Sequence, residues 1–183
     1  LLISRQAYSD TLTGLPNRRA LDERLEDEVS SARRNGYSFA VIMMDLDGFK
    51  SVNNSHGHAA GDEVLRLVFN QMARGVRTTD FLARYGGDEL TLILTQSDVS
   101  SALIVASKIT ETMRDLKYKL PDGKFLKLGI SGGIALYPVH GRTGPDLLRA
   151  ADAALYHAKK YKRGSFEIAR GVTAPFSKPS GEE

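Results

Sequence analysis

The chain of 183 residues contains no cysteine. Disulfide bonds and thiolate metal sites are therefore excluded, which suits a reducing compartment. No run of about eighteen apolar residues is present either, so the sequence predicts no membrane-spanning helix. Residues 1–3 lack the length and flanks of a signal peptide, and we expect them to continue a longer chain upstream.

Extended basic runs are also missing. The 25 Lys and Arg residues are nearly balanced by 22 Asp and Glu, and the net charge is only +3. A nucleic-acid-binding face needs clustered Lys and Arg, often with aromatic residues between them. Residues 159–163 form the single dense basic cluster, which is long enough for a polyphosphate but not for a polymer. We therefore expect no nucleic acid polymer as a partner.

The composition that remains is that of a soluble globular protein, with 42% apolar and 26% charged residues. The length suits one domain with a substantial core, and no internal repeat is visible. Helical periodicity and strand-like runs alternate along the chain, which predicts an α/β or α+β fold with helices packed on a sheet. Helices are predicted at 18–35, 61–75, 99–116 and 145–161, and strands at 39–44, on both sides of residues 86–87, at 125–130, at 134–136 and at 166–168.

The organisation along the chain has three parts. Residues 1–16 are expected to hold the end of a leader helix and a turn motif, in which Gly14 and Pro16 break the helix. Residues 17–169 form the main domain, and Asn17 is placed to cap its first helix. Residues 170–183 have no periodicity and are expected to be disordered.

Two adjacent acidic residues follow a glycine pair in the middle of the chain. Gly86 and Gly87 supply the positive φ that a tight hairpin turn requires, and Asp88 and Glu89 come next, before a buried strand. Asp45 directly follows the buried run 39–44. If the two strands are neighbours, three carboxylates meet at one edge of the sheet, which is unfavourable unless a cation binds there. The alternative is a solvated strand end and a polar hairpin tip.

Such hard oxygen ligands suit Mg²⁺ or Mn²⁺. Two such ions lie about 3.5 to 4 Å apart in enzymes that transfer phosphoryl groups. One ion would activate an attacking hydroxyl and the other would neutralise a triphosphate. The turn at residues 47–50 offers free backbone N–H groups that could hold phosphates.

Four segments together resemble the GGDEF family of diguanylate cyclases. Residues 86–90 resemble its signature hairpin, with Leu90 where the family has Phe, and residues 10–19 resemble its N-terminal motif. Residues 45–62 closely resemble its first substrate-binding segment. Residues 158–164 resemble its triphosphate segment, Ala-Lys-x-x-Gly-Arg-Asn, although Lys162 and Gly164 depart from it.

The resemblance implies a mostly antiparallel, palm-like cyclase fold with the hairpin at the active site, and it implies roles for individual residues. Guanine offers two donors that a carboxylate can accept, which suits a base-reading role for an acidic residue. The implied sets are Asp45, Asp88 and Glu89 for catalysis; Asp45, the Leu46 carbonyl, Asp88 and Glu89 for two Mg²⁺ or Mn²⁺; Phe49, Lys50, Asn53, His58, Asp62, Lys159 and Arg163 for GTP; and Arg77 and Asp80 for an inhibitory product site.

Simpler alternatives exist for several of these residues. Asn53 and Asp62 could cap or start a helix, and Lys159 and Arg163 could complement the negative end of a helix dipole. Arg77 and Asp80 could form an ordinary ion pair. The remaining neighbours Arg84 and Tyr85 are expected to be structural, and His56 to be a surface histidine.

The implied activity is condensation of two GTP into cyclic di-GMP with release of pyrophosphate. It requires a homodimer, because each ribose 3′-hydroxyl attacks the nucleotide held by the other domain. The resemblance also implies product inhibition and a sensory module upstream, in the cytoplasm or in the cytoplasmic part of a membrane-attached sensor. Leu90 supports an alternative, a catalytically degenerate module that binds GTP or cyclic di-GMP. A polymerase-like domain would need an extended basic channel, which this sequence lacks.

Overall fold

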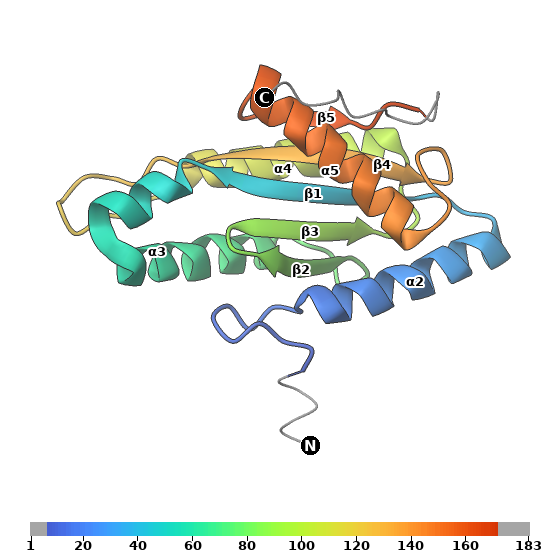
Figure 1. The fold of residues 1–183 in the computed structure, drawn as a ribbon, viewed down its shortest axis with the longest axis horizontal. Helices are drawn as coiled ribbons and strands as arrows, with labels where there is room; N and C mark the ends of the chain where they lie inside the picture. The colour runs from blue at the N-terminus through green and yellow to red at the C-terminus, as the bar shows by residue number, and fades with distance from the viewer. Residues whose placement is uncertain (1–6, 172–183) are drawn as a thin grey trace, which may run out of the picture.

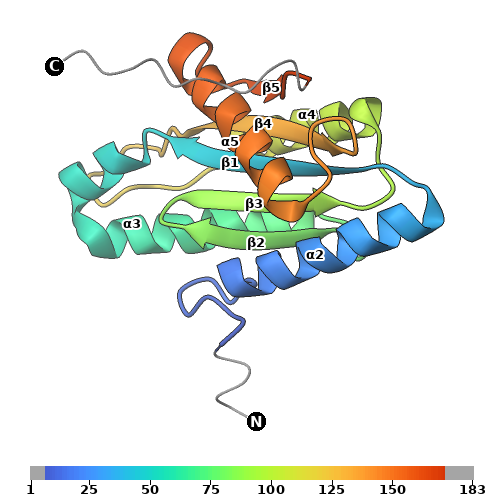
Figure 2. The same ribbon diagram turned by 45° about the vertical axis from the view of Figure 1, so that its right-hand side comes forward.

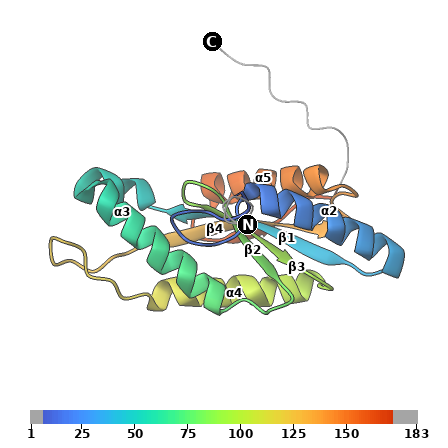
Figure 3. The ribbon, with the colours of Figure 1, turned by 90° about the horizontal axis from the view of Figure 1, so that it is seen from below.

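The computed structural model describes residues 7–171 of the chain. These residues form a five-stranded sheet in the order β2-β3-β1-β4-β5, in which β4 and β5 are parallel and the other neighbours antiparallel. Helices α2 and α5 cover one face, and α3 and α4 cover the other (Figures 1 and 3). The elements are α2 (Arg18–Asn35), β1 (Phe39–Asp47), α3 (Phe49–Arg74), β2 (Phe81–Gly86), β3 (Glu89–Leu94), α4 (Val99–Asp115), β4 (Gly129–Tyr137), α5 (Gly144–Tyr161) and β5 (Phe166–Ile168). The predicted mostly antiparallel sheet with surrounding helices is confirmed.

The central strand β1 is buried on both faces because helices cover both sides of the sheet. Its side chains alternate between two core clusters. Ala40, Ile42, Met44 and Leu46 belong to the cluster that includes α3 and α4 residues. Phe39, Val41 and Met43 belong to the cluster that includes α2 and α5 residues. The same alternation directs Asp45 and Asp47, the next odd positions, to the α5 side.

Helix α2 begins and ends where its sequence signals predict. The Asn17 side chain accepts a hydrogen bond from the Ala20 N–H at 3.1 Å. Gly36 ends the helix in the left-handed conformation, with φ of 70°. The predicted bounds 18–35 and the predicted cap are therefore confirmed.

Three predicted boundaries were wrong. The helix predicted from residue 61 begins at Phe49, and Gly57 (φ 83°, ψ 167°) breaks it, which interrupts the apolar periodicity. Strand β1 continues through Asp47, beyond the predicted end at residue 44. Strand β4 is one continuous element, and residues 125–128 lie outside it.

Gly132 and Gly133 lie inside β4 because neighbouring segments approach the strand closely there. A Cβ atom on Gly132 would lie 2.3 Å from the Phe166 ring. A Cβ on Gly133 would lie 2.0 Å from the Ala151 carbonyl oxygen and 2.4 Å from the Leu155 nitrogen. The glycine pair therefore permits α5 to pack directly on the sheet.

Two predictions fall mainly outside the described residues. The predicted leader helix covers residues 1–6, which are not described, and Ala7 and Tyr8, which lie in a turn. The predicted disordered tail, residues 170–183, also lies outside the described residues except for Arg170 and Gly171. Within residues 7–171, no helix combines the length and the apolar character needed to cross a membrane.

We expect Gly133→Ala to destabilise the domain by about 3 kcal/mol or more, because the backbone of α5 cannot move away from the added methyl without losing its packing. Denaturant unfolding measures this change. Gly75→Ala is the matched control, since Gly75 has φ of −85° and its nearest contact to an added Cβ is 3.6 Å away. Equal stabilities of the two variants would contradict the packing argument.

Candidate active site

The predicted acidic residues lie together at one end of the sheet. Asp45 of β1 is directly opposite Glu89 of β3, so both side chains project from the same face. The Leu46 N–H donates to the Asp88 carbonyl oxygen at 3.4 Å, which ties the hairpin turn to β1. The turn between β2 and β3 lies at the same end of the sheet as the C-terminal end of β1 (Figure 2).

Lys159 of α5 reaches these carboxylates from above the sheet. Its Nζ lies 2.7 Å from Asp45 Oδ2 and 3.7 Å from Asp47 Oδ1. The side chains of Asp45 and Asp47 are only 16% and 8% exposed, so these ion pairs are partly shielded from water. The residue predicted to bind triphosphate is thus next to the residue predicted to bind metal.

The electrostatics of this group show that its carboxylates repel one another. Burial, together with the neighbouring Asp45 carboxylate, raises the pKa of Asp88 to about 7. Burial also raises the pKa of Glu89, with further contributions from the charges of Asp45 and Asp152, while Lys159 and Arg18 oppose the rise. One lysine does not neutralise this cluster, so a bound cation would be favourable here.

The donor atoms fit a hard divalent cation. Asp45 Oδ1 and Asp47 Oδ1 are buried and have no hydrogen-bond partner among the described residues. Free carboxylate oxygens of this kind are the ligands that Mg²⁺ and Mn²⁺ prefer. Within residues 7–171, no three His, Cys, Asp or Glu side chains are arranged to hold a metal ion by themselves. Lys159 is bound to Asp45 instead.

The turn after β1 has the features expected of a phosphate site. Gly48 adopts φ of 86° and is the N-cap of α3, and no side chain caps the first turn of this helix. Backbone N–H groups at the N-terminus of α3 are therefore not engaged by a capping side chain. Phe49 is buried, whereas Lys50 is exposed.

The predicted base-reading residues lie on α3, on either side of its break at Gly57. The Oδ1 atom of Asn53 is buried without a hydrogen-bond partner and packs against Gly61, where an added Cβ would lie 1.8 Å from it. Asp62 follows Gly61 and is exposed, as is His58. Gly48 is the N-cap of α3, so Asn53 does not cap this helix, and Asp62 follows the break at Gly57.

His56 was predicted to be a surface histidine, which was wrong. Its side chain is only 13% exposed, and its Nε2 lies 3.7 Å from Asp122 Oδ2. This contact joins α3 to the loop before β4.

Lys159 and Arg163 do not share a helical face. Helix α5 ends at Tyr161, Lys162 is its C-cap, and Arg163 lies exposed beyond it. The chain then turns back onto the sheet, where the Gly164 N–H donates to Ser131 Oγ at 2.9 Å. Lys159 is therefore carried by the helix, whereas Arg163 is carried by the loop that follows it.

Arg77 and Asp80 form a two-pronged ion pair. Arg77 Nε donates to Asp80 Oδ2 at 2.9 Å, and Nη2 donates to Oδ1 at 3.1 Å. The Asp80 side chain is 3% exposed and that of Arg77 is 61% exposed. The ion pair named as the simpler alternative is present, and it leaves much of the guanidinium facing solvent.

Arg84 joins the N-terminal motif to the hairpin. Its guanidinium donates to the Gly87 carbonyl at 2.9 and 3.0 Å and to Asp10 Oδ1 at 2.9 Å. The carbonyl that it binds precedes Asp88, so Arg84 restrains the turn that carries the acidic pair. The expected structural role of Arg84 is confirmed. Tyr85 packs beneath the Arg18 guanidinium, which is 4.6 Å from the ring centre.

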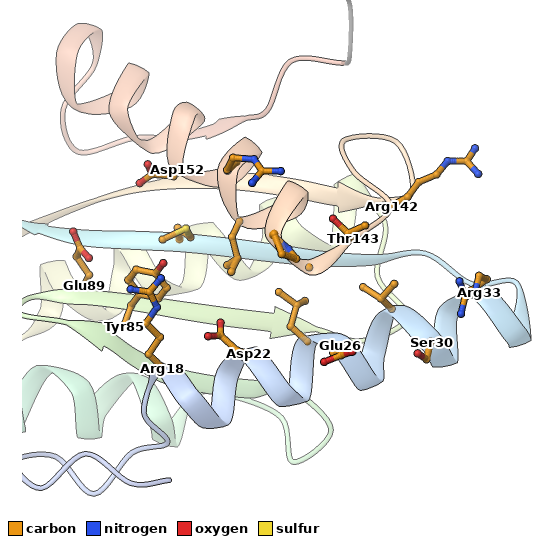
Figure 4. Close-up of a pocket in the computed structure, with 17 residues that line it drawn as sticks. Arg18, Asp22, Glu26, Ser30, Arg33, Tyr85, Glu89, Arg142, Thr143 and Asp152 are labelled. Carbon is orange, nitrogen blue, oxygen red and sulfur yellow. The ribbon is translucent and has the colours of Figure 1, made fainter. Parts of the chain in front are cut away.

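A cleft of about 880 Å³ lies between α2, the hairpin and the N-terminal half of α5 (Figure 4). Glu89 and Asp152 lie toward one end of it, and Arg142 and Arg33 toward the other (Figure 4). Of the residues predicted for the site, only Glu89 lines this cleft. Sequence reasoning missed Asp152, which faces outward by helical periodicity. Its effect on Glu89 depends on the packing of α5 against the sheet.

Comparisons with known proteins agree with this geometry. A model of the family described as "Diguanylate cyclase, GGDEF domain" matches residues 7–165. The chain belongs to the GGDEF family. This match covers the hairpin, the α3 segment and the end of α5, and it confirms the family resemblance.

Curated relatives of the chain are named diguanylate cyclases. The chain is 41% identical over 160 residues to the bifunctional diguanylate cyclase/cyclic di-GMP phosphodiesterase MucR of Pseudomonas aeruginosa, covering 87% of this chain and 23% of that protein. It is 38% identical to the diguanylate cyclase TpbB of the same species, covering 91% of this chain and 38% of that protein. The chain therefore spans well under half the length of either relative.

Solved structures share the fold. The GGDEF domain of TpbB (YfiN) from Pseudomonas aeruginosa matches with a TM-score of 0.84 and 38% identity, over 88% of this chain and 94% of that one. The coiled coil and GGDEF domain of DgcB from Caulobacter crescentus, in complex with c-di-GMP, matches with a TM-score of 0.86 and 29% identity, over 92% of this chain and 88% of that one. The palm-like cyclase fold is thereby confirmed.

The raised pKa of Asp88 gives a pH-dependence of stability. A carboxyl with a raised folded-state pKa binds its proton more tightly when folded, so its ionisation destabilises the fold as the pH rises from 3.8 to about 7. Without divalent metal, the free energy of unfolding of the wild type should fall between pH 5 and pH 7.5. We expect this fall to be smaller by about 1 to 2 kcal/mol in Asp88→Asn, after allowance for solvent screening. Denaturant unfolding at pH 5 and pH 7.5 in EDTA measures it. Parallel pH profiles for the variant and the wild type would contradict it.

Proposed function

We propose that this domain condenses two GTP molecules into cyclic di-GMP and releases two pyrophosphates. The observation that carries the proposal is the pairing of Asp45 with Glu89 beside Asp88, in contact with Lys159, within a GGDEF family fold. The group combines oxygen donors for a metal with a cation for phosphate, as nucleotidyl transfer requires. Because GTP is the substrate, the domain is proposed to act in the cytoplasm.

The proposed metal site consists of Asp45, the Leu46 carbonyl, Asp88 and Glu89. Diguanylate cyclases of this family are generally metal-dependent, and we propose two Mg²⁺ or Mn²⁺ per site. Bound there, the metal would increase the nucleophilicity of a hydroxyl and screen the charge of the triphosphate. Burial and, second to it, the neighbouring carboxylates raise the pKa values of Asp88 and Glu89, which supports this role for them.

The proposed GTP site lies around the hairpin, the start of α3 and the end of α5. Backbone N–H groups at Phe49 and Lys50 would hold phosphate oxygens, and Lys159 would leave Asp45 to meet the triphosphate as metal binds. Arg163, exposed beside this helix end, would bind the same group. The Asp62 carboxylate would accept hydrogen bonds from the two donors on the guanine edge. The Asn53 amide would contact the same edge, with His58 beside it. The unpartnered Asn53 Oδ1 supports this proposal.

A single domain cannot complete the product. Each 3′-hydroxyl must attack the α-phosphorus of the other GTP, which breaks one bond to pyrophosphate and forms one phosphodiester bond. A homodimer with the two sites facing each other is therefore part of the proposed mechanism. An upstream module would regulate this pairing, in keeping with relatives that are longer than this chain.

The second candidate function is a degenerate module that binds nucleotide without catalysis. Its support is Leu90, which replaces the family's Phe. Leu90 is 1% exposed and faces the core opposite Met44, so the substitution changes apolar packing and not the charges of the site. All acidic positions of the implied metal site are retained, which favours the enzyme.

We expect the purified chain with GTP and Mg²⁺ to form cyclic di-GMP, with a specific activity that increases with protein concentration because a dimer is required. Glu89→Gln should lower this activity at least about a hundredfold, because it replaces a metal-binding carboxylate with an uncharged amide of similar shape. Nucleotide chromatography provides the measurement. Glu111→Gln, an exposed residue of α4, is the matched control. Binding of GTP without turnover by the wild type would favour the degenerate module.

We also propose that cyclic di-GMP inhibits the domain at Arg77 and Asp80, where the exposed guanidinium is already oriented by its partner. Arg77→Ala should raise the product concentration for half-inhibition at least about tenfold, because it removes a charge-assisted, two-pronged contact. Initial rates at increasing cyclic di-GMP measure this. Arg74→Ala, three residues earlier and also exposed, should leave inhibition unchanged. Equal inhibition of the wild type and Arg77→Ala would remove the site from consideration.

A further inference from the structure

A buried hydrogen-bond chain connects β1 to the segment that follows α5. Ser131 Oγ donates to Asp47 Oδ2 at 2.6 Å and accepts from the Gly164 N–H at 2.9 Å. Ser131 is fully buried, and Asp47 is 9% exposed. We call residues 162–165 the cationic loop, because Lys162 and Arg163 lie in it. Neither Asp47 nor Ser131 is among the catalytic, metal-binding or GTP-binding residues that the family resemblance implies.

The Asp47 carboxylate determines how the Ser131 hydroxyl is oriented in this chain of hydrogen bonds. A hydroxyl group has one donor hydrogen, and Asp47 accepts it, so Ser131 presents only lone pairs to the cationic loop. The Gly164 N–H donates to these lone pairs. This N–H and the Arg163 carbonyl belong to the same peptide unit. The Asp47 carboxylate therefore fixes the orientation of the peptide unit between Arg163 and Gly164.

The other oxygen of Asp47 faces Lys159. Nζ of Lys159 lies 3.7 Å from Asp47 Oδ1, which has no hydrogen-bond partner among the described residues, and 2.7 Å from Asp45 Oδ2. Asp47 is thus next to Lys159 and is linked through Ser131 to the peptide that follows Arg163. It acts on Lys159 through charge and on Arg163 through the Ser131 hydroxyl.

A second contact shows that the bond to Ser131 is not needed merely to keep the loop attached. The Gly132 N–H donates to the Ser165 carbonyl at 3.0 Å, and the Phe166 ring packs over Gly132. The cationic loop therefore stays on the sheet without the Ser131 hydroxyl. What the hydroxyl adds is the orientation of the Arg163–Gly164 peptide.

We propose that Asp47 and Ser131 are positioning residues that align Lys159 and Arg163 on the terminal phosphates of the nucleotide. This inference rests on the proposed function of the same site and specifies which part of the substrate these two buried groups recognise. Neither residue forms a hydrogen bond or ion pair with Asn53 or Asp62, which are proposed to bind the guanine base. The effect of Asp47 and Ser131 on nucleotide affinity should therefore depend on how many phosphates the nucleotide carries.

The test compares two nucleotides that cannot react because they lack the attacking hydroxyl, 3′-deoxy-GTP and 3′-deoxy-GMP, by calorimetric titration of the 183-residue chain with Mg²⁺. Ser131→Ala should weaken 3′-deoxy-GTP roughly tenfold, the loss expected for one charge-assisted hydrogen bond, and change 3′-deoxy-GMP by less than about twofold. Asp47→Asn keeps an acceptor for Ser131 but loses its charge, so it should weaken 3′-deoxy-GTP selectively as well.

Thr91→Val is the matched control. Thr91 is fully buried in β3, and its Oγ1 has no hydrogen-bond partner within residues 7–171, so removal of this hydroxyl should leave both affinities unchanged. If Ser131→Ala does not fold, as judged by thermal unfolding, Asp47→Asn decides the question.

Equal losses for the two nucleotides, or no loss for either, would overturn the positioning role. A wild type that binds 3′-deoxy-GTP no better than 3′-deoxy-GMP would overturn both this inference and the phosphate site on which it rests. A wild type that discriminates between the nucleotides but forms no cyclic di-GMP from GTP would overturn only the cyclase.

Discussion

The repulsion among carboxylates at one end of the sheet is the constraint on which the site depends. Asp45 and Glu89 are directly opposite each other, and burial together with the nearby Asp45 raises the pKa of Asp88 to about 7. Lys159 is held at 2.7 Å from Asp45 by this excess of negative charge. Since one ammonium group leaves buried oxygen atoms without partners, the same end of the sheet is suited both to a divalent cation and to a phosphate.

The double-sided sheet makes this concentration of charge possible. Strand β1 carries apolar side chains alternately to two cores, and the odd positions that continue past its apolar run are Asp45 and Asp47. Close packing of α5 on Gly133 brings Lys159 onto the same face. The restraints from Arg84 to the Gly87 carbonyl and from Ser131 to Asp47 lie on either side of the group, so both the hairpin and the end of α5 are anchored near it.

Much of the fold could be predicted because its signals are local. The Asn17 cap, the Gly36 stop and the apolar stripe between them determine α2. In the hairpin only Gly87 has the predicted positive φ, of 45°, whereas Gly86 is the last residue of β2. The extent of α3 could not be predicted, because Gly57 is non-helical and divides the element into two helical segments whose apolar positions do not share one continuous period. The position of Arg163 could not be predicted either, since α5 ends before it and a tertiary hydrogen bond to Ser131 directs the loop.

The sequence by itself determined the family, the order of the elements and the acidic and basic residue types of the candidate site, because these depend on short motifs and on periodicity. Only the tertiary structure decided which charges meet. The contact of Lys159 with Asp45 and Asp47, the influence of Asp152 on Glu89 and the bond from Ser131 to Asp47 each join residues from different elements. Strand register and helix packing set those distances, and no local sequence signal encodes them.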